Sequence, residues 1–214
     1  MIDYSVLPMF LAACFILVIS PGPDLLLIGS YSSKQGVKSG AAITLGIFVA
    51  GILQTLFVAF GLAKLLTIIP MLSVALKLMG ALYFLWLGLK LIQQWYAHGE
   101  ASAAPLQSVN KSGAQLFLIG MLNNLLNPKA LLFFALFLPQ FTHNGADIFL
   151  QILTLGFILI FVALLINLAL SVVFSIAGKK LANKFKIGRY VDGILGLLFI
   201  TLAGRLAFSS EQGV

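Results

Sequence analysis

The sequence predicts an all-α membrane protein of six transmembrane helices, built as two inverted three-helix repeats with broken helices 1 and 4. Its 214 residues are 61% hydrophobic and 9% charged, with a mean hydropathy of +1.09. A soluble domain carries roughly 25% charged residues. The length leaves room for about six spans of ~20–25 residues with short loops. A polar, helix-breaking motif also occurs twice, once in each half of the chain.

The apolar runs define the elements in order. Spans are expected at about 6–28, 41–63, 71–95 and 114–138, within 148–178, and at 191–208. The start of the chain lacks the basic region of a signal peptide, so the first run is expected to be retained as a span. Small and polar residues at about 97–112 form a linker between repeat one (about 1–96) and repeat two (about 113–214). Together they make one transmembrane domain over 1–214.

The basic residues indicate the orientation. The net charge of +7 comes from residues in short loops, which favours a topology signal over a nucleic-acid partner. One side of the membrane receives nine of them: Lys34, Lys38, Lys90, Lys111, Lys179, Lys180, Lys184, Lys186 and Arg189. The other side receives Lys64, Lys77 and Arg205. Both termini are therefore expected outside and the basic loops in the cytoplasm, and three spans per half make the repeats inverted.

The two motifs are Ser20-Pro21-Gly22-Pro23-Asp24 and Asn127-Pro128-Lys129, whose first prolines lie 107 residues apart. Serine and asparagine are good N-caps, and proline suits the first helical position. Each motif is therefore expected to begin a new half-helix inside the membrane, with Ser20 and Asn127 as caps. Such a break offers free N–H groups to a carboxylate and free carbonyls to an ammonium group. Matched interruptions of this kind are typical of a transporter binding site.

Asp24 and Lys129 are the ionisable residues deepest in apolar sequence. A charge at that depth is costly unless it is paired or hydrated. Two roles stay open. The residues pair and hold the repeats together, or Asp24 takes the ammonium and Lys129 the carboxylate of a zwitterion, with Asp24 also carrying a proton. Asp24 is expected near the cytoplasmic end of its span and Lys129 near mid-membrane.

Other polar residues in the spans are secondary candidates. Asn123 and Asn124 precede the second break and either line the cavity or bond freed carbonyls. Gln54 is a further binding candidate, although helix–helix hydrogen bonding is the expected role for Gln54, Thr55 and Asn167. Small residues along the start of the second span allow close packing within or between subunits, which leaves a homo-oligomer open. They are Gly36, Gly40, Ala42, Gly46, Ala50 and Gly51.

These residues resemble the LysE/RhtB family of amino-acid exporters over nearly the whole chain. The resemblance rests on the two motifs, on Gly36 and Gly40, and on the run Gly80–Gly88. It implies export of amino acids or close derivatives across the bacterial inner membrane, driven by the proton-motive force, with protons and lipid as partners and no cofactor. A nucleotide-binding loop GxxxxGK[ST] is missing from the sequence, so a coupling ion is expected.

Three alternatives remain. A metal-ion or other small-solute exporter of the same architecture would need several metal-binding side chains in the spans, where only Asp24 clearly qualifies. His98 and His143 are loop residues on opposite sides, and the single Cys14 is expected to pack in the core. A membrane enzyme would need a clustered nucleophile or acid–base pair. A non-transporting scaffold has no need for matched intramembrane breaks.

Overall fold

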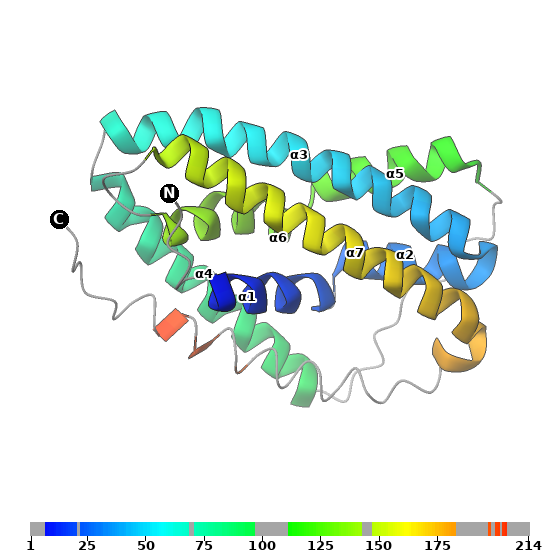
Figure 1. The fold of residues 1–214 in the computed structure, drawn as a ribbon. Helices are drawn as coiled ribbons and strands as arrows, with labels where there is room; N and C mark the ends of the chain where they lie inside the picture. The colour runs from blue at the N-terminus through cyan, green and yellow to red at the C-terminus, as the bar shows by residue number, and fades with distance from the viewer. Residues whose placement is uncertain are drawn as a thin grey trace.

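The computed structural model describes residues 7–20, 22–68, 71–96, 111–142 and 147–182, together with 197, 200, 201, 203 and 204. Every regular element in these residues is a helix (Figure 1), which confirms the all-α prediction. The elements are α1 (Leu7–Ile19), α2 (Pro23–Gln35), α3 (Val37–Ile68), α4 (Met71–Tyr96), α5 (Gly113–Leu125), α6 (Pro128–Leu132), the π-helix η2 (Phe133–Phe137), the 3-10 helix η3 (Leu138–Phe141) and α7 (Ile148–Ala182).

Two helices in the described part of the chain are long and apolar enough to cross a membrane, through Val37–Gly61 of α3 and Ile148–Ile176 of α7. Two bent pairs bring the number to four if each pair is one span. Leu7–Ile19 and Pro23–Gln35 meet at 57°, and Gly113–Leu125 and Lys129–Phe141 at 54°. The breaks predicted in helices 1 and 4 are therefore confirmed. The helix predicted at 71–95 is α4, whereas residues 97–110 and most of 191–208 lie outside the described residues.

The first bent pair is longer than predicted. Its span was expected to end at about residue 28, but α2 continues to Gln35 and stops at Gly36, whose φ of 87° favours glycine. Ser33, near its end, fits a helix because its hydroxyl Oγ donates to the Gly29 carbonyl one turn earlier at 2.7 Å. Asp24 consequently lies in the first turn of a helix that continues to Gln35, seven residues beyond the predicted end of the span.

The second bent pair departs from α-helix after the break. A π-helix and a 3-10 turn follow α6, and Pro139 at that junction has no N–H for a helical hydrogen bond. Aromatic rings fix this segment against α1. The Phe10 ring centroid lies 5.7 Å from that of Phe137 and 5.2 Å from that of Phe141, and all three side chains are buried.

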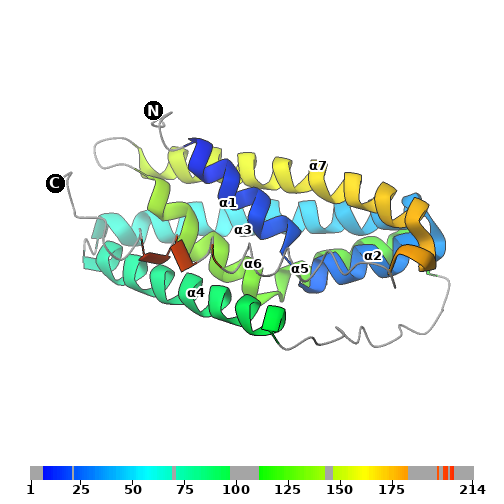
Figure 2. The same ribbon diagram turned by 90° about the horizontal axis from the view of Figure 1, so that it is seen from below.

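Helix α3 runs antiparallel to α7, and the first bent pair runs antiparallel to the second. Helices α3 and α7 lie side by side along the molecule (Figures 1 and 2). Gly40 of α3 faces Ser171 of α7, and Gly51 faces Ile160. The bent pairs also cross antiparallel, because the start of α1 packs on η2 and η3 while Asp24 of α2 reaches the end of α5.

Large apolar side chains lie exposed along the outer faces of the two long helices. On α7 they include Leu150, Phe157, Phe161, Leu165, Val172 and Ile176, and on α3 Leu45, Leu53, Phe57 and Phe60. Faces of this kind are unfavourable in water and suit the hydrocarbon of a bilayer. The protein is therefore a membrane protein.

Helices α3 and α5 approach each other through glycine. A Cβ at Gly46 would overlap the backbone carbonyl of Phe117, and one at Gly120 would overlap that of Ile43. Backbone atoms cannot swing aside as a flexible side chain can. Gly46, one of the small residues predicted to allow close packing, therefore packs α3 against α5 as expected, and Gly120 does so from the α5 side.

Gly46→Ala is expected to lower the stability of the folded protein by about 2 kcal/mol, because the added methyl group forces α3 and α5 apart. The measurement is thermal unfolding of the purified protein in detergent. Gly61→Ala is the matched control, since a Cβ there meets no atom within 4 Å. Equal melting temperatures for the two variants would contradict this packing.

Candidate binding pocket at the two helix breaks

The second break, residues 126–127, begins its half-helix as the sequence predicts. Asn127 is the N-cap, and its Oδ1 accepts a hydrogen bond of 3.0 Å from the backbone N–H of Lys129. Pro128 opens the helix, and the first helical bond runs from the Leu131 N–H to the Asn127 carbonyl at 3.0 Å. The cap satisfies one of the free donors at the start of α6.

The first break, residues 20–22, is built differently from the prediction. Gly22 with extended backbone is the N-cap of α2, and Pro23 opens the helix. Ser20 instead belongs to the end of α1, where its N–H donates to the Ile16 carbonyl at 2.9 Å. The residue before a proline avoids helical geometry, so Ser20 ends one helix, and the second proline sets the start of the next. Pro21 lies outside the described residues.

Lys129 binds the end of α1. Its ammonium nitrogen Nζ donates to the Leu17 carbonyl at 3.0 Å, the Ser20 carbonyl at 2.9 Å and Ser20 Oγ at 2.7 Å. These carbonyls lack helical partners because α1 ends there. A cation at the C-terminal end of a helix is also favoured by the helix dipole. The three N–H donors of an ammonium group match these three oxygens.

Asp24 accepts hydrogen bonds from the side-chain amides around the second break. Its carboxylate accepts from Asn123 Nδ2 at 2.6 Å, Asn124 Nδ2 at 2.8 Å and Asn127 Nδ2 at 3.3 Å. Asp24 also stands in the first turn of α2, where the helix dipole favours a negative charge. The lysine of the second break thus holds the first half of the chain, and the carboxylate after the first break holds the second half.

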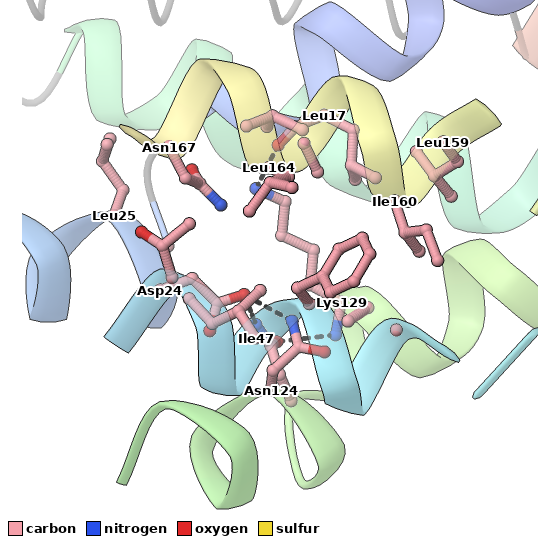
Figure 3. A pocket seen from close by; sticks show the side chains of 18 of the residues that line it. Leu17, Asp24, Leu25, Ile47, Asn124, Lys129, Leu159, Ile160, Leu164 and Asn167 are labelled. Atoms are coloured by element: carbon pink, nitrogen blue, oxygen red, sulfur yellow. Dashed lines mark hydrogen bonds between the residues drawn. The ribbon is translucent and has the colours of Figure 1, made fainter. Parts of the chain in front are cut away.

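A pocket lies where the breaks meet, between α1, α2, α3, α5, α6 and α7 (Figure 3). Its polar lining is Ser20, Asp24, Thr44, Asn124, Asn127, Lys129 and Asn167. The apolar lining is Leu17, Val18, Leu25, Ile47, Phe48, Ala130, Phe134, Leu159, Ile160, Ala163 and Leu164, with Gly22 and Gly51 between. A carboxylate, an ammonium group and several amides therefore share one cavity with an aliphatic and aromatic wall.

The family model of the LysE type translocator matches residues 15–210. The chain belongs to the LysE translocator family. Among its relatives, the leucine efflux protein of Salmonella typhimurium (strain LT2) is 30% identical over 204 residues, with 92% of each chain covered. That of Enterobacter sp. (strain 638) is 29% identical over 204 residues, covering 92% of this chain and 93% of the relative. The protein is thus a transporter and not an enzyme. No solved structure matches the chain.

In this LysE-type translocator most of the predicted site residues converge. Ser20, Gly22, Asp24, Asn124, Asn127 and Lys129 line the pocket, and Asn123 reaches it through Asp24. Pro23 and Pro128 shape the breaks from the first positions of α2 and α6. Gln54 lies outside the lining, and its Nε2 donates to the Asn124 carbonyl at 3.2 Å, which confirms its predicted helix–helix bond.

Two features of the pocket are not predicted from the sequence. The asparagines bind a carboxylate, a role that the sequence does not predict for them. Thr44 lines the pocket, but it is one of three threonines spaced along an apolar helix, with Thr55 and Thr67, and nothing in its sequence neighbourhood marks it. Thr44 differs from Thr55 only in its position on α3, which places it on the side of the helix that faces the breaks.

Asp24→Ala is expected to lower the melting temperature of the translocator clearly, because three amide donors lose their acceptor at about 1–3 kcal/mol for each group left unsatisfied. Asp24→Asn keeps one acceptor oxygen and is expected to lose less. Thermal unfolding in detergent measures both variants. A melting temperature of Asp24→Ala equal to that of wild type would show that the carboxylate does not hold the breaks together.

Proposed function

We propose that this protein exports an α-amino acid with an aliphatic side chain, leucine or one of similar size, from the cytoplasm. The observation that carries the proposal is the pocket at the crossing of the two breaks, which combines charges of both signs with an apolar wall. The relatives named leucine efflux proteins support the substrate class.

The pocket chemistry suits a zwitterion. Asp24 and Lys129 together add no net charge, so a substrate that is itself neutral overall but carries both charges meets a complementary field. The wall formed by Phe48, Phe134 and the leucine and isoleucine side chains of α7 suits an apolar side chain. A metal-ion exporter is less well supported, because the lining has one carboxylate and neither histidine nor cysteine.

Transport would proceed by alternating access between two inverted repeats of three spans each. The antiparallel relation of α3 to α7, and of the two bent pairs, supports this arrangement. The pocket would open to the cytoplasm and then outward as one repeat rocks against the other. Both termini would lie outside the bacterial inner membrane, with the basic loops in the cytoplasm.

Proton antiport would return the transporter to the state that binds substrate from the cytoplasm. The Asp24 carboxylate accepts three amide hydrogen bonds that join the two halves. Protonation replaces part of its acceptor capacity with an O–H donor, which the amide N–H groups cannot accept. A proton arriving from outside would thereby loosen the link between the breaks and allow the halves to move. No cofactor is needed for this cycle, and the proton-motive force supplies its energy.

Uptake of labelled leucine into everted inner-membrane vesicles tests the proposal. Vesicles that contain the protein and carry a pH gradient, acid inside, are expected to accumulate leucine well above vesicles without the protein. A protonophore should abolish the difference. Accumulation that persists after the gradient has collapsed would reject proton coupling, and no accumulation of any amino acid would reject amino-acid export.

Lys129→Ala is expected to reduce leucine accumulation at least tenfold while the protein still reaches the membrane. The pocket loses its cation, and the last carbonyls of α1 lose the donor that holds them. Lys90→Ala is the control that removes the same charge from an exposed position on α4, over the Trp86 ring. Export by Lys129→Ala at the level of Lys90→Ala would remove Lys129 from the site.

A further inference from the structure

We infer that Thr44 and Asn167 bind the ammonium and carboxylate head group of the transported amino acid, and that the region around Gly51 and Ile160 receives its side chain. The inference rests on the proposed function and adds the residues and the orientation of the substrate. Both residues line the pocket, Thr44 from α3 and Asn167 from α7.

The charged residues already have protein partners. The ammonium group of Lys129 donates to three oxygens at the end of α1, and the Asp24 carboxylate accepts from three asparagine amides. Their charges still act on a ligand through the pocket, but their hydrogen bonds hold the two breaks together. A bound head group therefore needs further donors and acceptors.

Thr44 and Asn167 have side-chain donors and acceptors that could bind such a head group. The Thr44 side chain is 1% exposed, and its hydroxyl oxygen has no hydrogen-bond partner. Asn167 is 5% exposed, and its side-chain amide makes no hydrogen bond to another described residue. In Figure 3 the Asn167 side chain points into the pocket, toward the space beside Asp24. Leaving a buried polar group unpaired costs about 1–3 kcal/mol, a cost that a ligand would relieve.

Thr44 differs from the other buried, unpartnered polar side chains because it lines the pocket. Within the described part of the chain, the other buried side-chain atoms without a partner are Ser32 Oγ, Gln54 Oε1 and Thr55 Oγ1. None of those three residues lines the pocket. Thr44 is thus the one of the four that a substrate in this pocket can reach.

The packing of α3 against α7 places the two residues at one level. Gly40 faces Ser171, and Gly51 faces Ile160, in antiparallel order. Four residues along α3 from Gly40 is Thr44, and four residues back along α7 from Ser171 is Asn167. The pair formed by Gly51 and Ile160 lies seven residues away on each helix, roughly 10 Å along the axis.

The two levels differ in chemistry. At the first, a hydroxyl and an amide each both donate and accept hydrogen bonds, which suits a head group that carries donors on its ammonium and acceptors on its carboxylate. At the second, Phe48, Leu159 and Ile160 are apolar, and a methyl group added to Gly51 would collide with the Ile160 side chain. An amino acid lying along the pocket would therefore direct its side chain toward Gly51 and Ile160.

Transport kinetics in everted vesicles test the assignment. Thr44→Val and Asn167→Leu keep the side-chain shape and remove the hydrogen-bonding groups. Each is expected to raise the half-saturating concentration about tenfold, and by the same factor for leucine, valine and methionine, which share one head group. Ile160→Ala is expected to change the ranking of these three substrates instead. Thr55→Val is the matched control, because Thr55 is buried and unpartnered on the same helix but lies outside the pocket lining.

Thermal unfolding supplies a second readout that does not depend on transport. Replacing an unpartnered buried hydroxyl by a methyl group should leave the substrate-free Thr44→Val protein at least as stable as wild type. Added leucine should raise the melting temperature of wild type and of Thr55→Val, and raise that of Thr44→Val and Asn167→Leu much less.

The outcomes separate the two proposals. Wild-type affinity in both Thr44→Val and Asn167→Leu, with leucine still transported, would overturn the assignment and leave amino-acid export standing. A loss of affinity that differs between leucine, valine and methionine would place these residues at the side chain and overturn it as well. A wild-type protein that neither transports nor is stabilised by any amino acid would overturn both.

Discussion

The reciprocal hydrogen bonding between the two breaks is the interaction on which the rest of this structure depends. Each break leaves backbone groups without helical partners in a setting that offers little water. The second break supplies a cation for the carbonyls of the first, and the first supplies a carboxylate for the amides of the second. Asn127 caps α6 within its own half, and the bonds of Lys129 and Asp24 link each break to the other half. The bent pairs must therefore cross at these residues, and the crossing defines where a pocket can form.

Small residues allow the long helices α3 and α7 to pack closely around the place where the bent pairs cross. Gly46 and Gly120 let α3 and α5 meet backbone to backbone, and Gly40 and Gly51 bring α7 against α3. Larger residues at these positions would hold α3 and α7 away from the breaks and open the pocket to lipid. The glycines thus determine how near the polar lining of α3 and α7 comes to Asp24 and Lys129.

The all-α class, both breaks and the presence of Asp24 and Lys129 in one pocket follow from the sequence, because proline and charge in apolar runs have few physical solutions. The cap of the first break was mispredicted, since two prolines two residues apart both satisfy the rule for a helix start and only the tertiary packing decides between them. The extent of α2 was missed for a similar reason. Its run of serines is typical of a loop, but the Ser33 hydroxyl bonds to a carbonyl of the helix itself. Thr44 could not be identified, because facing a pocket depends on the rotation of α3, which one threonine does not reveal.

The division between charged and neutral polar groups has a consequence for a carrier. If Asp24 and Lys129 bound the substrate with the same hydrogen bonds that join the breaks, each cycle would have to break that junction before binding could occur. Binding by separate neutral groups would avoid this, because the Thr44 hydroxyl has no protein partner and could bind a head group without first releasing a protein contact. On this proposal the charges of Asp24 and Lys129 would act at a distance on the bound zwitterion, while movement between the halves would depend on the junction alone. Binding and movement can in this way be coupled through electrostatics without competing for the same donors and acceptors.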